Sequence, residues 1–131
     1  VAKFLAANSL VAAVYYPGFA SHPNHNAAKR LMDGFGGMVS FELHDNDGSK
    51  TRKFINALAL DEKEGKGIVS HCVSLGTVDT LICCPAHSTH FKVPREERLG
   101  QGISDNLIRL SVGTEEVEDI IYSLERGFKA I

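Results

Sequence analysis

One hexapeptide alternates strictly between two faces, and this alternation sets the fold class. In MVSFEL (residues 38–43), Val39, Phe41 and Leu43 fall on one face, and the residues between them fall on the other. Such alternation is typical of a strand whose sheet is buried on one face and open on the other. The sequence therefore predicts a sheet that is covered on one side only.

The rest of the chain supplies more strands and the helices to cover them. Apolar runs bounded by turn residues predict strands at 11–18, 68–75, 80–84 and 107–112, the second and third of them paired. Apolar residues at helical spacing predict helices at 27–35, 49–60, 94–100 and 114–128. Ser49 and Thr114 are the expected N-caps. The first residues are typical of a helix whose beginning is missing, and DEKEGKG (61–67) predicts an exposed loop.

These elements predict one α+β domain over residues 1–131, a mainly antiparallel sheet with helices packed on one face. With 44% hydrophobic and 23% charged residues, the chain can bury a core. Its 14 basic and 16 acidic side chains are dispersed, which predicts no nucleic-acid partner. No apolar stretch approaches the ~20 residues of a membrane span, and three cysteines favour a reducing compartment. We expect a cytoplasmic protein with no membrane partner.

Arg109 is unusual because it lies in the middle of the apolar run LIRLSV (107–112), on the face opposite Ile108 and Leu110. A guanidinium in this position can hold a carboxylate through two parallel hydrogen bonds, a geometry that lysine cannot copy. An ion pair with an acidic neighbour or a plain surface charge is the commoner explanation for such a residue. The residues alone leave these alternatives open.

Cysteine and histidine residues of the second half raise the possibility of a small zinc module. The spacing of Cys84, His87 and His90 fits no standard zinc pattern. Cys72, Cys83 and Cys84 lie within apolar runs, where free cysteine behaves as a small hydrophobe. The sequence therefore predicts structural cysteines and no metal site.

Other short motifs point to no particular chemistry. Ser74 lacks the Gly-x-Ser-x-Gly elbow of a serine hydrolase, and GFGG (34–37) lacks the lysine of a phosphate-binding loop. DNDG (45–48) lacks the later glutamate of a calcium loop. His22 and His25 follow a Pro-Gly turn and are predicted to be exposed to solvent.

Six segments, taken in order, carry a resemblance to a known family. They are YPGFASHPNHNAAKR (16–30), GFGGMVSFEL (34–43), VSLGTVDTLI (73–82), CPAHSTH (84–90), VPREER (93–98) and GISDNLIRLSVGTEEVEDII (102–121). Together they resemble the C-terminal domain of the pyridoxal-phosphate-dependent transsulfuration enzymes of cysteine and methionine metabolism. This family includes cystathionine gamma-synthase, the cystathionine beta- and gamma-lyases and methionine gamma-lyase, which the chain resembles most.

The resemblance implies that residues 1–131 are the small C-terminal, substrate-binding domain of a fold-type I pyridoxal-phosphate enzyme. In that family a large N-terminal domain carries the cofactor and its Schiff-base lysine, and the full chains form a homotetramer. None of the eight lysines here lies in a motif like the family's Ser-x-Thr-Lys. The resemblance therefore implies pyridoxal phosphate in the full-length enzyme, none bound covalently to this fragment, and no activity of the fragment alone.

The resemblance also implies roles for four residues. Arg109 matches the arginine that binds the substrate α-carboxylate. Ser74 matches a catalytic and substrate-binding serine beside the cofactor lysine, and Thr89 matches a threonine near the same cleft. Val73 occupies a position where several cystathionine-processing members have glutamate, so an apolar side chain there favours an uncharged thioether substrate.

The implied reaction is a methionine gamma-lyase-like γ-elimination that yields 2-oxobutanoate, ammonia and a thiol. Methionine, cystathionine and homocysteine are the expected substrates. Cystathionine gamma-lyase, beta-lyase and gamma-synthase activities remain alternatives, as does a stand-alone, non-catalytic binding domain. The residues decide neither the substrate nor the role of the charged insertion at 61–67.

Overall fold

The computed structural model describes residues 1–131 and contains five strands and six helical segments. The strands are Val11–Tyr15 (β1), Met38–Leu43 (β2), Ser70–His71 (β3), Leu81–Cys83 (β4) and Leu107–Ser111 (β5). The helices are Ala2–Ala7 (α1), His25–Leu31 (α2), Ser49–Lys63 (α3), Arg95–Gly100 (α4) and Val117–Phe128 (α5), with a 3-10 turn at Pro85–His87 (η1). None of the helices is both long and apolar enough to cross a lipid bilayer.

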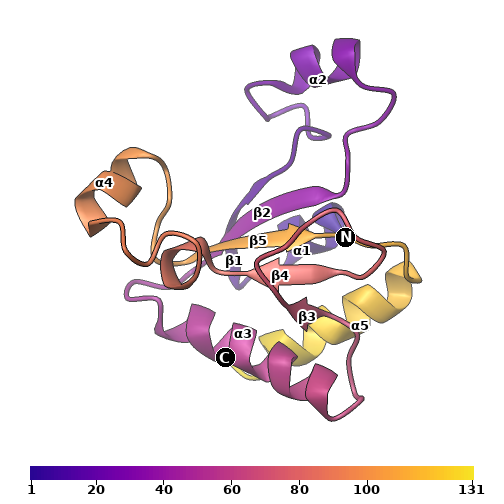
Figure 1. The fold of residues 1–131 in the computed structure, drawn as a ribbon. Helices are drawn as coiled ribbons and strands as arrows, with labels where there is room; N and C mark the ends of the chain where they lie inside the picture. The colour runs from indigo at the N-terminus through magenta and orange to yellow at the C-terminus, as the bar shows by residue number, and fades with distance from the viewer.

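The strands form one sheet in the order β1-β2-β5-β4-β3. Three neighbouring pairs are antiparallel, and only β3 and β4 run parallel. In Figure 1, α3 and α5 lie side by side below the sheet. The predicted α+β class and the mainly antiparallel sheet are confirmed.

The core lies between the sheet and the helices α1, α3 and α5, and it contains 16 buried residues. The alternation in β2 is observed as predicted, because Val39, Phe41 and Leu43 are buried while the residues between them are half-buried. Phe54 of α3 packs 4.8 Å from the Phe128 ring of α5, measured between ring centroids. Burial of each large apolar side chain stabilises the fold by about 1.5–3 kcal/mol.

An ion pair joins α3 to α5 near the end of α3, which extends beyond the predicted Leu60. The Asp61 carboxylate accepts hydrogen bonds from Arg126 Nε at 2.6 Å and from Arg126 Nη2 at 2.9 Å. These hydrogen bonds hold the pKa of Asp61 below its usual value. The prediction of a loop over 61–67 was therefore wrong for its first three residues, since the last turn of α3 includes Asp61 and ends at Lys63.

The predicted N-caps were also wrong. Gly48, with a positive φ of 73°, is the N-cap of α3, and Ser49 is the first helical residue. Helix α5 begins at Val117, and the Thr114 hydroxyl donates instead to the carbonyl oxygen of Val78 at 3.3 Å. Thr114 therefore stabilises a loop that is distant in sequence and does not cap the start of α5.

The segment between β1 and β2, which includes α2, projects away from the sheet (Figure 1). Helix α2 ends at Leu31 rather than at Phe35 as predicted. His22 and His25 are half-buried, so the prediction of exposed histidines was wrong. His25 Nδ1 lies 2.8 Å from the carbonyl oxygen of Pro17, and its ring stacks on Phe35 at 5.3 Å. These contacts pack the projecting segment against itself, separately from the main core.

The two apolar runs predicted as paired strands do pair, but in parallel, with Ser70 opposite Leu81 and His71 opposite Ile82. The first run keeps only two strand residues. A parallel pair requires the chain to return to the same end of the sheet. Residues 72–79, here called the crossing loop, make this return by passing over β4 toward β5 (Figure 1).

Candidate functional site

Arg109 lies in the middle of β5 on the face of the sheet that points away from the core. Its Cα partners are Ser40 on β2 and Cys83 on β4. Its chain neighbours Ile108 and Leu110 are 0% exposed on the opposite, helix-covered face. Strand alternation therefore places Arg109 on the face predicted from the sequence.

The backbone of the crossing loop holds the guanidinium of Arg109. Nη2 donates to the carbonyl oxygen of Val73 at 2.6 Å and to that of Ser74 at 2.9 Å. Nε is buried and has no hydrogen-bond partner. A buried donor without an acceptor costs about 1–3 kcal/mol. This N–H group is therefore suited to an acceptor from outside the chain, such as a carboxylate oxygen.

The geometry of the guanidinium means that the crossing loop controls how a carboxylate can bind Arg109. A carboxylate uses two adjacent nitrogens of arginine, and both available edges of the group, Nε with Nη2 and Nη1 with Nη2, include Nη2. The two carbonyl groups of Val73 and Ser74 engage that shared nitrogen. Bidentate binding of a carboxylate to Arg109 therefore requires at least one of these carbonyl groups to move away from Nη2.

Two further contacts fix the crossing loop over the sheet. Gly76, at a positive φ of 73°, donates its backbone N–H to Ser111 Oγ at 2.9 Å. At the end of the loop, the backbone N–H and hydroxyl of Thr80 donate to the Glu115 carboxylate at 2.6 and 2.7 Å. Burial by itself would raise the pKa of Glu115, but these hydrogen bonds lower it below its usual value. The ionised Glu115 carboxylate therefore stabilises the end of the crossing loop by accepting these two hydrogen bonds.

The other predicted site residues differ in how close they lie to Arg109. Val73 is 52% exposed and Ser74 is also exposed, and both reach Arg109 through their carbonyl groups. Thr89 follows η1, and its exposed hydroxyl lies 2.8 Å from His90 Nδ1. The structure thus brings Val73 and Ser74 to Arg109, whereas the contact of Thr89 is with its chain neighbour.

The sequence did not predict that two further residues lie near Arg109. Ser111 anchors the crossing loop, and Cys83 is the Cα partner of Arg109 on β4. Ser111 follows Arg109 by two residues, so strand alternation alone places both on the same face. The position of Cys83 depended on a strand register that the sequence does not reveal.

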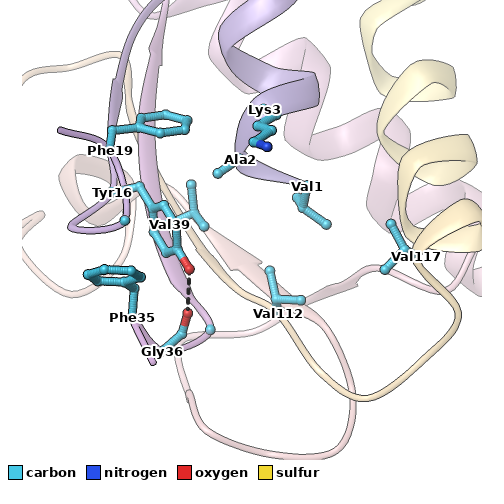
Figure 2. A pocket seen from close by; sticks show the side chains of 12 residues that line it. Val1, Ala2, Lys3, Tyr16, Phe19, Phe35, Gly36, Val39, Val112 and Val117 are labelled. Atoms are coloured by element: carbon cyan, nitrogen blue, oxygen red, sulfur yellow. Dashed lines mark hydrogen bonds between the residues drawn. The ribbon is translucent and has the colours of Figure 1, made fainter. Parts of the chain in front are cut away.

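The largest hollow of the molecule lies away from Arg109, between the start of α1 and the ends of β2 and β5. Its volume is about 380 Å³. Figure 2 shows the Tyr16 hydroxyl donating to the Gly36 carbonyl oxygen, 3.1 Å away, among mostly apolar side chains. The lining residues are Val1, Ala2, Lys3, Tyr16, Gly18, Phe19, Phe35, Gly36, Gly37, Val39, Val112 and Val117. With Lys3 as its one charged residue, this hollow is distinct from the arginine site.

No group of three or more His, Cys, Asp or Glu side chains is arranged to hold a metal ion. Cys83 and Cys84 are buried and Cys72 is half-buried, and all three are free thiols. The burial of Cys83 and Cys84 agrees with the prediction that they pack as small hydrophobes, whereas Cys72 is partly accessible.

The sequence profile of the Cys/Met metabolism pyridoxal-phosphate-dependent enzymes matches residues 1–129. The chain therefore belongs to this family. It is 46% identical over 132 residues to L-methionine gamma-lyase of Fusobacterium nucleatum subsp. polymorphum, with 100% of this chain and 31% of that protein covered. It is 42% identical over 129 residues to cystathionine beta-lyase of Lactococcus lactis subsp. cremoris, with 98% and 31% covered.

A solved structure agrees with these matches. The crystal structure of cystathionine gamma-lyase from Lactobacillus plantarum complexed with L-serine superposes with a TM-score of 0.85 at 40% identity. The superposition covers 98% of this chain and 31% of that one. The chain thus spans about a third of the length of the relatives that it matches, and its fold is that of the C-terminal domain of such lyases.

The residues of this chain do not fit a covalently held pyridoxal phosphate. A lysine that forms a Schiff base is activated by desolvation or by a neighbouring cation in a sheltered site. All eight lysines of the chain are exposed to solvent. The open face of the sheet instead presents Arg109, whose guanidinium can bind a carboxylate group.

Proposed function

We propose that residues 1–131 are the C-terminal, substrate-binding domain of a pyridoxal-phosphate-dependent carbon–sulfur lyase. The reaction is a γ-elimination like that of methionine gamma-lyase, which releases 2-oxobutanoate, ammonia and a thiol from the substrate. The observation that carries the proposal is the buried, unpartnered Nε of Arg109 on the open face of the sheet.

Arg109 binds the α-carboxylate of the amino acid. One carboxylate oxygen accepts from Nε, and the other accepts from Nη2 after a carbonyl of the crossing loop withdraws. Because the guanidinium is planar and held on a strand, this contact fixes the orientation of the substrate as well as its position. The carbon-acid chemistry itself belongs to the cofactor carried by the rest of the enzyme.

The crossing loop supplies the contacts next to the carboxylate. Ser74 presents an exposed side chain beside Arg109, where it positions the lysine that moves protons in the intact enzyme. Val73 is exposed and uncharged, which favours a thioether side chain such as that of methionine. Thr89 contributes to the same cleft from the segment after η1.

Activity of the intact polypeptide that carries these residues tests the proposal. The purified protein, loaded with pyridoxal phosphate, is incubated with L-methionine, L-cystathionine or L-homocysteine. Keto acid and thiol are measured together. We expect 2-oxobutanoate and a thiol in equal amounts from methionine. Failure to release keto acid from all three amino acids would contradict the proposed function.

Val73 gives a test of substrate preference. In Val73→Glu, a carboxylate can pair with the distal ammonium group of cystathionine, which methionine lacks. We expect the ratio of kcat/KM for cystathionine to that for methionine to rise about tenfold, the effect of one hydrogen bond between charged groups. Val78→Glu is the matched control, because Val78 is 67% exposed on the same loop. An equal ratio in both variants would contradict the assignment.

Cystathionine cleavage is the main alternative reaction. The identity to cystathionine beta-lyase, 42%, is close to the 46% identity to methionine gamma-lyase. The two reactions differ in their keto acids, because β-elimination of cystathionine yields pyruvate and γ-elimination yields 2-oxobutanoate. Pyruvate as the main product would therefore favour the beta-lyase alternative.

A further inference from the structure

The register of β3 and β4, extended by one residue, sets Cys72 opposite Cys83. The parallel register places Ser70 opposite Leu81 and His71 opposite Ile82, so the next pair is Cys72 and Cys83. The ladder extends to this pair, because the backbone N–H of Cys72 donates to the Ile82 carbonyl oxygen at 3.1 Å. Neighbouring strands lie about 4.8 Å apart, within the Cα separation of about 4.4–6.8 Å that disulfides span.

The surroundings of the two sulfur atoms differ in a way that suits a redox pair. Cys72 is half-buried, and its Sγ accepts the backbone N–H of Ser74 at 3.5 Å. Cys83 is 0% exposed. Burial raises the pKa of the Cys83 thiol despite the opposing charge of Arg109. An oxidant from solvent therefore reaches Cys72 first.

Cys84 is not part of this pair. It belongs to the buried core, and its thiol contacts the Asp105 carbonyl oxygen at 3.7 Å. Consecutive residues of a strand point to opposite faces, so the side chains of Cys83 and Cys84 diverge. The chain thus provides one facing pair of thiols and one internal control.

We propose that Cys72 and Cys83 form a reversible disulfide that locks the crossing loop over Arg109. The Cys72 thiolate attacks a small-molecule disulfide of the glutathione class, forms a mixed disulfide and releases one small thiol. The Cys83 thiol then loses its proton and attacks the Cys72 sulfur, which releases the second small thiol. Two protein thiols are oxidised to one disulfide, and one small disulfide is reduced to two thiols.

The lock acts through the carbonyl groups that follow Cys72. A bond to β4 holds the start of the loop down, which keeps the carbonyl oxygens of Val73 and Ser74 on Nη2 of Arg109. Because both carboxylate-binding edges of the guanidinium include Nη2, the oxidised loop competes with a substrate carboxylate. This last step rests on the proposed role of Arg109, whereas formation of the disulfide does not.

Formation of the disulfide is tested on the intact polypeptide with oxidised glutathione as the probe. Cleavage before Asp79 separates Cys72 from Cys83 and Cys84, and mass spectrometry of the non-reduced digest identifies the joined peptides. We expect the two peptides to be joined, with dithiothreitol reversing the bond. Cys84→Ala is expected to keep the bond, and Cys72→Ala to abolish it. Free thiols throughout, or a bond that requires Cys84, would overturn the proposal.

The effect on Arg109 is tested by comparing the KM for methionine in the reduced and oxidised protein. We expect oxidation to raise KM about tenfold, as when one hydrogen bond to a charged group is lost, and Cys72→Ala to be insensitive to oxidation. An unchanged KM in protein with the mapped disulfide would overturn the lock. If the reduced protein releases no keto acid, the proposed function fails, and the peptide mapping still decides whether the disulfide forms.

Discussion

Replacing Arg109 with lysine keeps the positive charge but removes the planar pair of donors. A carboxylate bound to Nε and Nη2 of arginine receives two charge-assisted hydrogen bonds, whereas the lysine ammonium group replaces them with one. The loss of one such bond corresponds to about 1.5–3 kcal/mol. At about 1.4 kcal/mol for each factor of ten, Arg109→Lys should lower kcat/KM about 10- to 150-fold. The loss should appear mainly in KM, because the carboxylate is bound equally in the ground state and the transition state.

The assay follows initial rates of 2-oxobutanoate release by the intact polypeptide over a wide range of methionine concentrations. Arg95→Lys is the matched control, because the Arg95 side chain is 62% exposed and pairs with Asp105 on the surface. Exposed ion pairs contribute little, so the control should saturate like the unmodified protein. An Arg109→Lys variant that saturates at the same methionine concentration as the control would refute the carboxylate assignment.

Two further predictions concern stability, each measured by denaturant unfolding. The hydrogen bond from Arg126 lowers the pKa of Asp61 in the folded state. The ionised carboxylate therefore stabilises the fold at pH values above the unfolded pKa of about 3.9. This contribution disappears as the pH falls through the lower pKa of the folded state. Asp61→Asn should therefore be less stable than the unmodified chain at pH 7 and equal to it in strong acid. A stability difference that does not change with pH would contradict this ion pair. Gly127→Ala adds a methyl group 2.8 Å from the buried Phe54 ring and should destabilise the fold by about 1–2 kcal/mol, since the clash exceeds the gain in helix propensity. Gly100→Ala meets no atom within 4 Å and should be neutral or slightly stabilising, so equal losses in both variants would contradict the packing argument.

Features that depend on neighbouring residues could be predicted from the sequence. The alternation of residues 38–43 identified the half-buried strand, because side-chain direction in a strand repeats every two residues. The same rule predicts that Arg109 lies on the open face of β5, as the structure shows. The predicted helix ends were less accurate, because Thr114 donates a hydrogen bond to the crossing loop and Asp61 pairs with Arg126 of α5. In both cases a tertiary contact determined how the polar side chain was used.

The sequence by itself determined the α+β class, the family and the identity of the exceptional arginine. Only the tertiary structure decided what holds that arginine, because its partners Val73 and Ser74 lie 36 and 35 residues away along the chain. The parallel pairing of β3 with β4 was likewise decided in three dimensions, since two-residue pairing carries no periodic signal. That pairing directs the crossing loop over β5 and sets Cys72 against Cys83. The chemistry near Arg109 therefore follows from a strand register that no local pattern encodes.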